Sequence, residues 1–345
     1  MIGTLIGVPL VGWFANGLGA ARMAALGATL VAIGYFSLAS ISALSSLISV
    51  AGFFIGVGWG AFYLAAPLAL SSRVSDQDRG FWFTRFGAFQ MGGIGLSPIA
   101  GSLMTSKLGL TTGQTFGVVA ATCIMSAAML ISFEYLSPRT NNAATPTKNA
   151  GWIRALPIIM RTKAVYPILM VGLGACVFGG LLTFQSSLVR GTELTASTFF
   201  AAYAITVVAS RFVLAPIIGR ANGDRAAIVL LLLMTAGVVV AFQFNFGVIV
   251  QIISAVLLGV GYGLVYSVIQ TQAVNDAPPE YRNAALTWFV IAYFVGIFGF
   301  PVFGGWLIVT SGKQWFLVAV LAFALAETAL AFVRILDGRN KIPRR

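Results

Sequence analysis

The chain has 345 residues, of which 59% are hydrophobic and 9% are charged, and its formal net charge is +12. Water-soluble domains carry about 25% charged residues, so this composition excludes one and indicates a chain built from membrane-spanning helices. The sequence contains no histidine, which excludes histidine metal sites, Ser-His-Asp hydrolysis and imidazole proton relays. Cys123 and Cys176 both lie in apolar runs, where we expect packing roles instead of a disulfide or a metal site.

Long apolar runs follow one another along almost the whole chain. A membrane-spanning helix needs about 20 mostly apolar residues. By this measure the sequence predicts eleven spans, at 1–15, 23–43, 48–70, 82–105, 114–136, 165–187, 195–218, 226–244, 247–270, 284–309 and 314–334. The first run is short and has no charged segment before it, so it resembles neither a signal peptide nor a complete span. The expected fold class is an all-α, polytopic membrane helix bundle.

The positive charges alternate between the two sides of this predicted bundle. Sixteen of the 21 Lys and Arg residues fall in every second loop and after the last span. The opposite loops hold three, which are Lys107, Arg190 and Lys313. By the positive-inside rule, the side with sixteen cations and the C-terminus are cytoplasmic, in a bacterial inner or plasma membrane. The net charge therefore orients the helices, and we expect no binding of nucleic acid.

One polar segment, rich in Pro, Asn and Thr, interrupts the apolar runs at 137–163. Such a composition is typical of a flexible linker. We therefore predict an N-terminal helix bundle of five spans at 1–136, a cytoplasmic linker at 137–163 and a C-terminal six-helix bundle at 164–345. The linker is expected to be a tether without a function of its own.

The sequence repeats itself without a gap at an offset of 203 residues, where IGVGWGAFY from Ile55 aligns with LGVGYGLVY from Leu258. Identical residues also coincide in other spans at this offset, among them Gly93 with Gly296, Pro98 with Pro301 and Gly101 with Gly304. We interpret these matches as two homologous halves. Spans one to five then correspond to spans seven to eleven, and the span at 165–187 has no partner. The repeat therefore predicts a twelve-helix design whose first helix precedes Met1 or has been lost.

Two six-helix halves joined by a basic cytoplasmic linker resemble the parallel repeats of the major facilitator superfamily. The segment GWFANGLGAAR at 12–22 resembles that family's loop between its second and third helices. Gly12, Gly19 and Arg22 match the family's pattern, and Asn16 stands where the family has an aspartate. The resemblance implies that this loop is a gating motif.

The fourth predicted span carries GGIGLSPIAGS at 92–102, which resembles the antiporter signature of the drug:proton antiporter branch. Gly93, Pro98 and Gly101 match that signature, and Ser97 and Ser102 replace two of its glycines. A proline among small residues frees a backbone carbonyl and lets a neighbouring helix come close. The resemblance therefore implies a second gating motif and favours an exporter.

Two ionisable residues lie deep in predicted spans, Arg211 and Glu327, each seven residues from the predicted cytoplasmic end of its span. Ionisable residues inside a membrane are candidates for function. With opposite signs at similar depth, they either pair with each other or line the inner vestibule, while Arg334 gives Glu327 a possible structural partner on its own helix face. For proton coupling, the sequence offers Glu327 and, nearer to a helix end, Glu134.

Uncharged polar and aromatic residues gather on the spans whose counterparts line the central cavity in the family. The expected cavity residues are Trp59, Tyr63, Gln90, Gln185, Tyr262, Tyr266, Gln270 and Tyr293. Aromatic walls with a few hydrogen-bonding groups suit amphiphilic or cationic organic molecules. The same aromatic residues could instead fill packing grooves beside the glycines.

The resemblance implies a secondary active transporter of a small organic molecule, with proton-coupled efflux by alternating access. The alternatives are a sugar or metabolite symporter or facilitator, and a transport-dead remnant or membrane sensor. An enzyme is not expected, because the spans contain no paired carboxylates and no lysine. We expect no cofactor and no metal. The expected partners are a small-molecule substrate, protons as coupling ion and the lipid bilayer, and the chain is expected to be a monomer.

Overall fold

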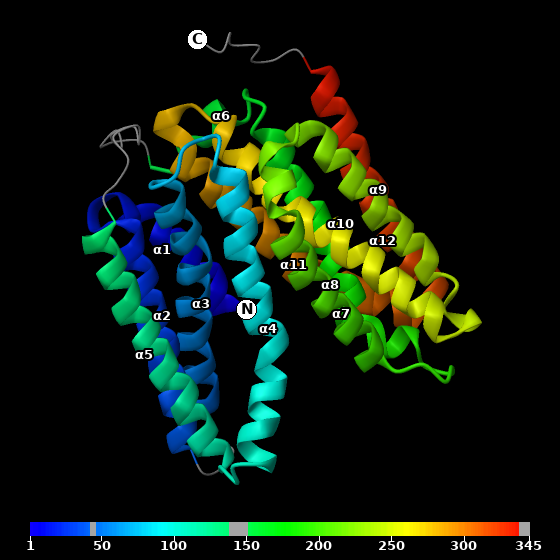
Figure 1. Ribbon diagram of the computed structural model, residues 1–345, viewed down its shortest axis with the longest axis horizontal. Helices are drawn as coiled ribbons and strands as arrows, with labels where there is room; N and C mark the ends of the chain where they lie inside the picture. The colour runs from blue at the N-terminus through cyan, green and yellow to red at the C-terminus, as the bar shows by residue number, and fades with distance from the viewer. Residues whose placement is uncertain (42–45, 138–150, 338–345) are drawn as a thin grey trace. The chain divides into compact units, whose positions relative to one another are not determined.

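The computed structural model describes residues 1–41, 46–137 and 151–337, and this part of the chain is almost entirely helical, without strands (Figure 1). Every predicted span is a helix. These helices are α1 (Ile2–Leu18), α2 (Ala20–Ser40), α3 (Leu47–Ser71), α4 (Arg79–Ser106), α5 (Thr112–Leu136), α7 (Val165–Leu188), α8 (Ala196–Arg220), α9 (Gly223–Ala241), α10 (Val248–Asn275), α11 (Arg282–Thr310) and α12 (Gly312–Leu336). The short elements are α6 (Leu156–Ile159), η1 (Phe244–Phe246) and η2 (Pro279–Tyr281).

Within the described residues, nine helices are long and apolar enough to cross a membrane: α2, α3, α5 and α7 to α12. Two of the eleven predicted spans are helices that do not meet this measure. The apolar stretch of α1, Ile2–Ala15, is shorter, as the sequence indicated, and α4 is less apolar than the other long helices. The structure confirms a polytopic helix bundle.

The chain forms two compact units. The first comprises Met1–Ser75, Leu96–Leu156 and Pro279–Ile291, and the second comprises Asp76–Gly95, Pro157–Pro278 and Ala292–Arg345. Both α4 and α11 therefore contribute one end to each unit. The division into bundles at 1–136 and 164–345 remains a prediction from the sequence.

In the first unit, α3 packs against α1 and α2, and α2 also packs against α5 (Figure 1). Glycines of α3 permit this close packing. A Cβ atom placed on Gly58 would lie 2.5 Å from the carbonyl oxygen of Gly27 and 2.7 Å from the backbone nitrogen of Val31. A Cβ atom on Gly60 would collide with the carbonyl oxygen of Thr4 on α1. The backbones of these helices therefore touch, as small residues allow in membrane helices.

The second unit repeats this packing with α10 in place of α3. A Cβ atom placed on Gly261 would lie 2.5 Å from the backbone nitrogen of Met234 and 2.7 Å from the carbonyl oxygen of Leu230, both on α9. A Cβ atom on Gly263 would lie 3.0 Å from a methyl carbon of Val207 on α8. Each of these residues stands 203 positions after its counterpart in the first unit. The sequence repeat is therefore also a repeat of helix contacts.

Candidate functional site

Aromatic side chains from four helices of the second unit gather around the predicted cavity residues. Tyr262 on α10 stacks on Phe178 of α7 with 4.8 Å between ring centroids. Phe178 also lies 6.0 Å from the ring of Tyr203 on α8. Tyr266 on α10 packs edge-on against Tyr293 of α11 at 5.5 Å. The structure thus brings three predicted residues into buried aromatic contacts, with Phe178 and Tyr203 as additional members.

Two glutamines predicted for the cavity are buried in the same unit. Gln270 on α10 is buried, and Gln185 on α7 has no exposed surface at all. Neither the amide oxygen nor the amide nitrogen of Gln185 has a hydrogen-bond partner among the described residues. Buried polar groups in proteins are almost always hydrogen-bonded. Gln185 is therefore a strong candidate for a group that binds a ligand.

The remaining predicted cavity residues are divided between the units. Trp59 and Tyr63 lie on α3 in the first unit, with 5.8 Å between their ring centroids, and Tyr63 is buried. Gln90 is half-buried on α4, in the part of that helix that belongs to the second unit. That these residues line one cavity with Tyr262 and Tyr266 remains a prediction.

Arg211 and Glu327 are both buried, and the structure does not pair them. Arg211 on α8 donates from Nε to the carbonyl oxygen of Gly263 on α10 at 2.6 Å. Its guanidinium also packs onto Gly87 of α4, where a side chain would collide with it. Glu327 on α12 faces Gly174 on α7 instead.

The residues of the first predicted gating motif surround the junction of α1 and α2. Gly12 packs onto the side chain of Trp152, and Gly19 joins the two helices with a φ of 91°, which favours glycine. The Arg22 guanidinium lies 5.7 Å from the ring centroid of Tyr135 on α5. The side chain of Asn16 lies outside the described part of the structure.

The second predicted gating motif lies on α4. A Cβ atom placed on Gly93 or on Gly101 would meet no atom within 4 Å. The described residues therefore do not show the close helix approach that small residues permit. The side chain of Pro98 is outside the described part, and the gating role of this motif remains a prediction.

Three tryptophans meet where the linker returns to the first unit. The ring of Trp152, just before α6, lies 6.0 Å from that of Trp13 on α1 and 5.1 Å from that of Trp288 on α11. The indole N–H of Trp288 donates to the carbonyl oxygen of Trp152 at 3.0 Å. Sequence reasoning missed this cluster. The predicted linker therefore packs onto α1 and α11 at Trp152.

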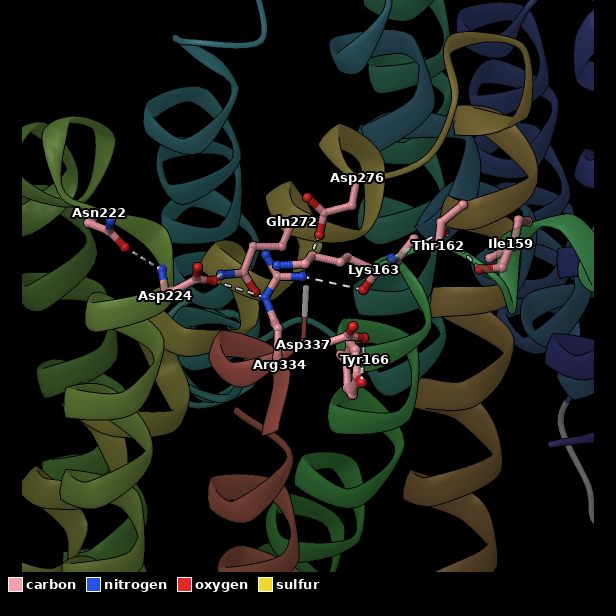
Figure 2. A network of polar contacts seen from close by, with 11 residues as sticks. Ile159, Thr162, Lys163, Tyr166, Asn222, Asp224, Gln272, Asp276, Arg334 and Asp337 are labelled. Atoms are coloured by element: carbon pink, nitrogen blue, oxygen red, sulfur yellow. Dashed lines mark hydrogen bonds and ion pairs between the residues drawn. The ribbon is translucent and has the colours of Figure 1, made fainter. Parts of the chain in front are cut away.

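Figure 2 shows a polar network at helix ends of the second unit, centred on Arg334 of α12. Arg334 pairs with Asp224 at the start of α9, at 2.9 Å, and with Asp276 just after α10. Its guanidinium also donates to the carbonyl oxygen of Lys163 at 3.3 Å. Burial raises the pKa of the Asp276 carboxyl above its ordinary value, against the opposing effect of the Arg334 charge. Arg334 thus binds these helix ends together and does not contact Glu327.

The first unit has a related ion pair at the ends of α3 and α5. Arg73 and Glu134 lie 2.5 Å apart, and the Arg73 guanidinium also lies over the ring of Phe133. Arg73 occupies the repeat position of Asp276, 203 residues earlier. In the first unit the cation follows α3 and the anion lies on α5, whereas in the second unit the anion follows α10 and the cation lies on α12. Of the two carboxyls predicted as candidates for proton coupling, Glu134 pairs with Arg73, whereas neither oxygen of Glu327 has a hydrogen-bond partner among the described residues.

No group of three metal-binding side chains occurs among the described residues. The described helices form a polytopic membrane bundle with buried aromatic and amide groups. Residues 1–301 match the Major Facilitator Superfamily, and the chain belongs to this family. It is a transporter of small molecules and not an enzyme.

Solved structures of transporters share this fold. The chain aligns with FucP in its outward conformation with a TM-score of 0.78 and 15% identity, covering 96% of this chain and 88% of that chain. FucP is described as the fucose:proton symporter of E. coli. The proton:xylose symporter XylE aligns with a TM-score of 0.75 and 13% identity, covering 96% of this chain and 83% of that chain. The human organic anion transporter MFSD10 aligns with a TM-score of 0.73 and 13% identity, covering 96% of this chain and 81% of that chain. A search of curated proteins finds no match.

Proposed function

We propose that this transporter exports a small organic molecule in exchange for protons by alternating access. The proposed membrane is the bacterial inner or plasma membrane, with the C-terminus in the cytoplasm, and the proposed assembly is a monomer. The substrate is proposed to bind at the two sets of aromatic and amide residues. These are Trp59, Tyr63, Gln90, Gln185, Tyr262, Tyr266, Gln270 and Tyr293.

The observation that carries this proposal is the amide of Gln185, which is completely buried and has no hydrogen-bond partner among the described residues. An unsatisfied buried amide is unfavourable for folding. A bound polar ligand that supplies the missing donor and acceptor would remove this cost. The aromatic rings of Phe178, Tyr262 and Tyr203 in the same unit would bind the apolar or cationic part of such a ligand.

The direction of transport rests on the motif around Gly93, Pro98 and Gly101, whose resemblance to the antiporter signature favours export. The two gating motifs, at 12–22 and 92–102, are proposed to close the two sides of the transport path in turn. Arg211 holds α8 to α10 at Gly263, and we propose that it orients the substrate-binding helices.

Symport is the second candidate, and a specific observation favours it. FucP and XylE, which are described as proton symporters of fucose and xylose, align with 96% of this chain. At 13–15% identity this likeness concerns the fold and leaves the substrate open.

The direction of a proton gradient separates the two candidates. The purified chain is reconstituted into liposomes, with the membrane potential clamped by potassium and valinomycin. Antiport predicts accumulation of tetraphenylphosphonium, an aromatic organic cation, when the lumen is acidic. Symport predicts accumulation of L-fucose or D-xylose when the exterior is acidic. If no probe accumulates beyond protein-free liposomes under either gradient, both proposals fail for these substrate classes.

Gln185→Leu tests the proposed binding site directly. Because the variant removes an unsatisfied buried amide, we expect the protein to become more stable by about 1–3 kcal/mol. Loss of a substrate hydrogen bond should weaken binding of the transported probe roughly tenfold. Gln243→Leu, which changes an exposed glutamine of the same unit, is the matched control. Unchanged probe affinity together with lower stability would mean that Gln185 is a structural residue.

A further inference from the structure

The geometry around Glu327 points to a proton-binding site: we propose that this carboxyl, enclosed between α12 and α7, carries the coupling proton. The inference rests on the proposed proton-coupled function and deepens it, because it assigns the coupling ion to one side chain. The proton would join a carboxylate oxygen on one side of the membrane and return to water on the other. No other bond is made or broken.

Glu327 is placed in a space that α7 leaves open for it. The residue has no exposed surface, although it lies nine positions before the end of α12, about 14 Å along the helix. A Cβ atom placed on Gly174 of α7 would lie 2.7 Å from its Oε2 atom and 2.9 Å from its Oε1 atom. Any side chain at position 174 would therefore displace the carboxyl group. The glycine and the glutamate fit together.

Neither oxygen of Glu327 has a hydrogen-bond partner among the described residues, and no described cation pairs with it. From α7, the thiol of Cys176 lies near Glu327, while Tyr166 donates to Asp337. From α9, the neighbouring contact is neutral, a hydrogen bond between Thr235 and Thr328. A charged carboxylate is strongly unfavourable in such surroundings, whereas the protonated acid removes that charge.

The cations that could have neutralised Glu327 are engaged elsewhere. Arg334, two turns further along α12, pairs with Asp224 and Asp276. Arg211 donates to the backbone of α10 at Gly263. A proton is therefore the cation that this site can take without rearranging either arginine. Release of the proton would require water to reach the carboxyl, and thus a state in which α12 and α7 are less closely packed.

The repeat argues that the carboxyl is not needed to hold the helices together. The position 203 residues before Glu327 is Ile124 on α5, so the same place in the repeat is apolar. Glu134 on α5, by contrast, pairs with Arg73. A buried acid at an otherwise apolar position, without a structural partner, fits a functional role.

Infrared spectroscopy tests the site without knowledge of the substrate. The reconstituted parent is recorded over a pH series, with Glu327→Gln, Glu327→Asp and, as control, the exposed Glu193→Gln. We expect a C=O stretching band of a protonated carboxyl that disappears as pH rises. It should be lost completely in Glu327→Gln and kept in Glu193→Gln. Glu327→Asp should keep a shifted band, which shows that the site folds with a shorter acid. Identical pH-difference spectra for the parent and Glu327→Gln would overturn the proposal.

A transport assay tests whether Glu327 couples proton movement to transport. With an acidic lumen, Glu327→Gln should lose accumulation of tetraphenylphosphonium down to the level of protein-free liposomes, yet keep exchange of labelled for unlabelled probe. Undiminished accumulation by the variant would also overturn the proposal. If the parent itself accumulates no probe, the proposed antiport function fails, while the infrared result still decides whether Glu327 binds a proton.

Discussion

Replacing the repeated glycines by alanine should destabilise both units through the same helix contact. The changes are Gly58→Ala on α3 and Gly261→Ala on α10. In both cases the nearest atoms to the new methyl group are backbone atoms at 2.5 Å, whereas ordinary van der Waals contact begins at 3.4 Å. Each helix pair must therefore move apart by about 1 Å, because backbone atoms cannot rotate out of the way as a side chain can.

The size of the effect follows from two opposing terms. Overpacking of a well-packed interior costs about 1–3 kcal/mol, and the rigid backbone contact places these sites at the upper end. Alanine recovers up to about 1 kcal/mol through its higher helix propensity. We expect a net loss of about 2 kcal/mol for each variant, or roughly 4–8 °C in melting temperature for units of this size.

The assay is thermal unfolding of purified protein in detergent, followed by tryptophan fluorescence. Gly52→Ala is the matched control, because it lies on α3 and an added Cβ atom there meets nothing within 4 Å. This variant should be as stable as the parent or slightly more stable. The double variant should show the sum of the two losses, since the sites belong to different compact units. If Gly58→Ala and Gly261→Ala melt no lower than Gly52→Ala, the close contacts do not stabilise the units.

Two further predictions concern side-chain contacts. Trp152→Ala should remove about 3–5 kcal/mol of packing against Trp13 and Trp288 and so speed up proteolytic cleavage of the linker; the exposed Trp315→Ala is the control, and equal cleavage rates would contradict the docking of the linker. Arg73→Ala should lower the stability of the first unit by roughly 3 kcal/mol, because it removes the cation that pairs with Glu134 in a mostly buried place, and the reversed pair Arg73→Glu with Glu134→Arg should recover part of that loss. A reversed pair no more stable than Arg73→Ala would show that the Phe133 and Ser137 contacts of Arg73, and not its charge, hold the two helix ends.

The helices were predictable because the signal for a membrane span is strong and local. The run at 165–187 predicts α7, which is observed at Val165–Leu188, to within one residue. The repeat also places Gly58 and Gly261 at matching positions, and the structure has matching helix contacts there. Both inferences use information that lies close together in the chain or recurs at a fixed offset.

The polar and aromatic side-chain contacts were not predictable, because they join residues that are far apart in the sequence. Nothing in the chain distinguishes Phe178 from the other phenylalanines, yet its ring is the one that stacks on Tyr262. Arg334 lies 110 residues after Asp224, and its position on the same helix face as Glu327 suggested a different partner. Trp152 lies in a polar segment whose composition is typical of a linker. Its packing depends on Trp13 of α1 and Trp288 of α11, which are both more than 130 residues away in the sequence.

The two halves of the repeat agree where backbone meets backbone and differ where side chains carry charge. Contacts such as Gly58 on Gly27 and Gly261 on Leu230 allow little variation, because any larger residue would separate the helices. At the helix ends, Arg73 pairs with Glu134 and its repeat counterpart Asp276 pairs with Arg334, whose own counterpart is Ile131, so the pairing partner comes from a different repeat position in each unit. At Glu327, by contrast, an acid stands where the repeat has an isoleucine, and no described residue compensates for it. A difference between repeats that brings no structural partner is therefore the one that most strongly indicates a function, which we propose for Glu327 in the second half of the chain.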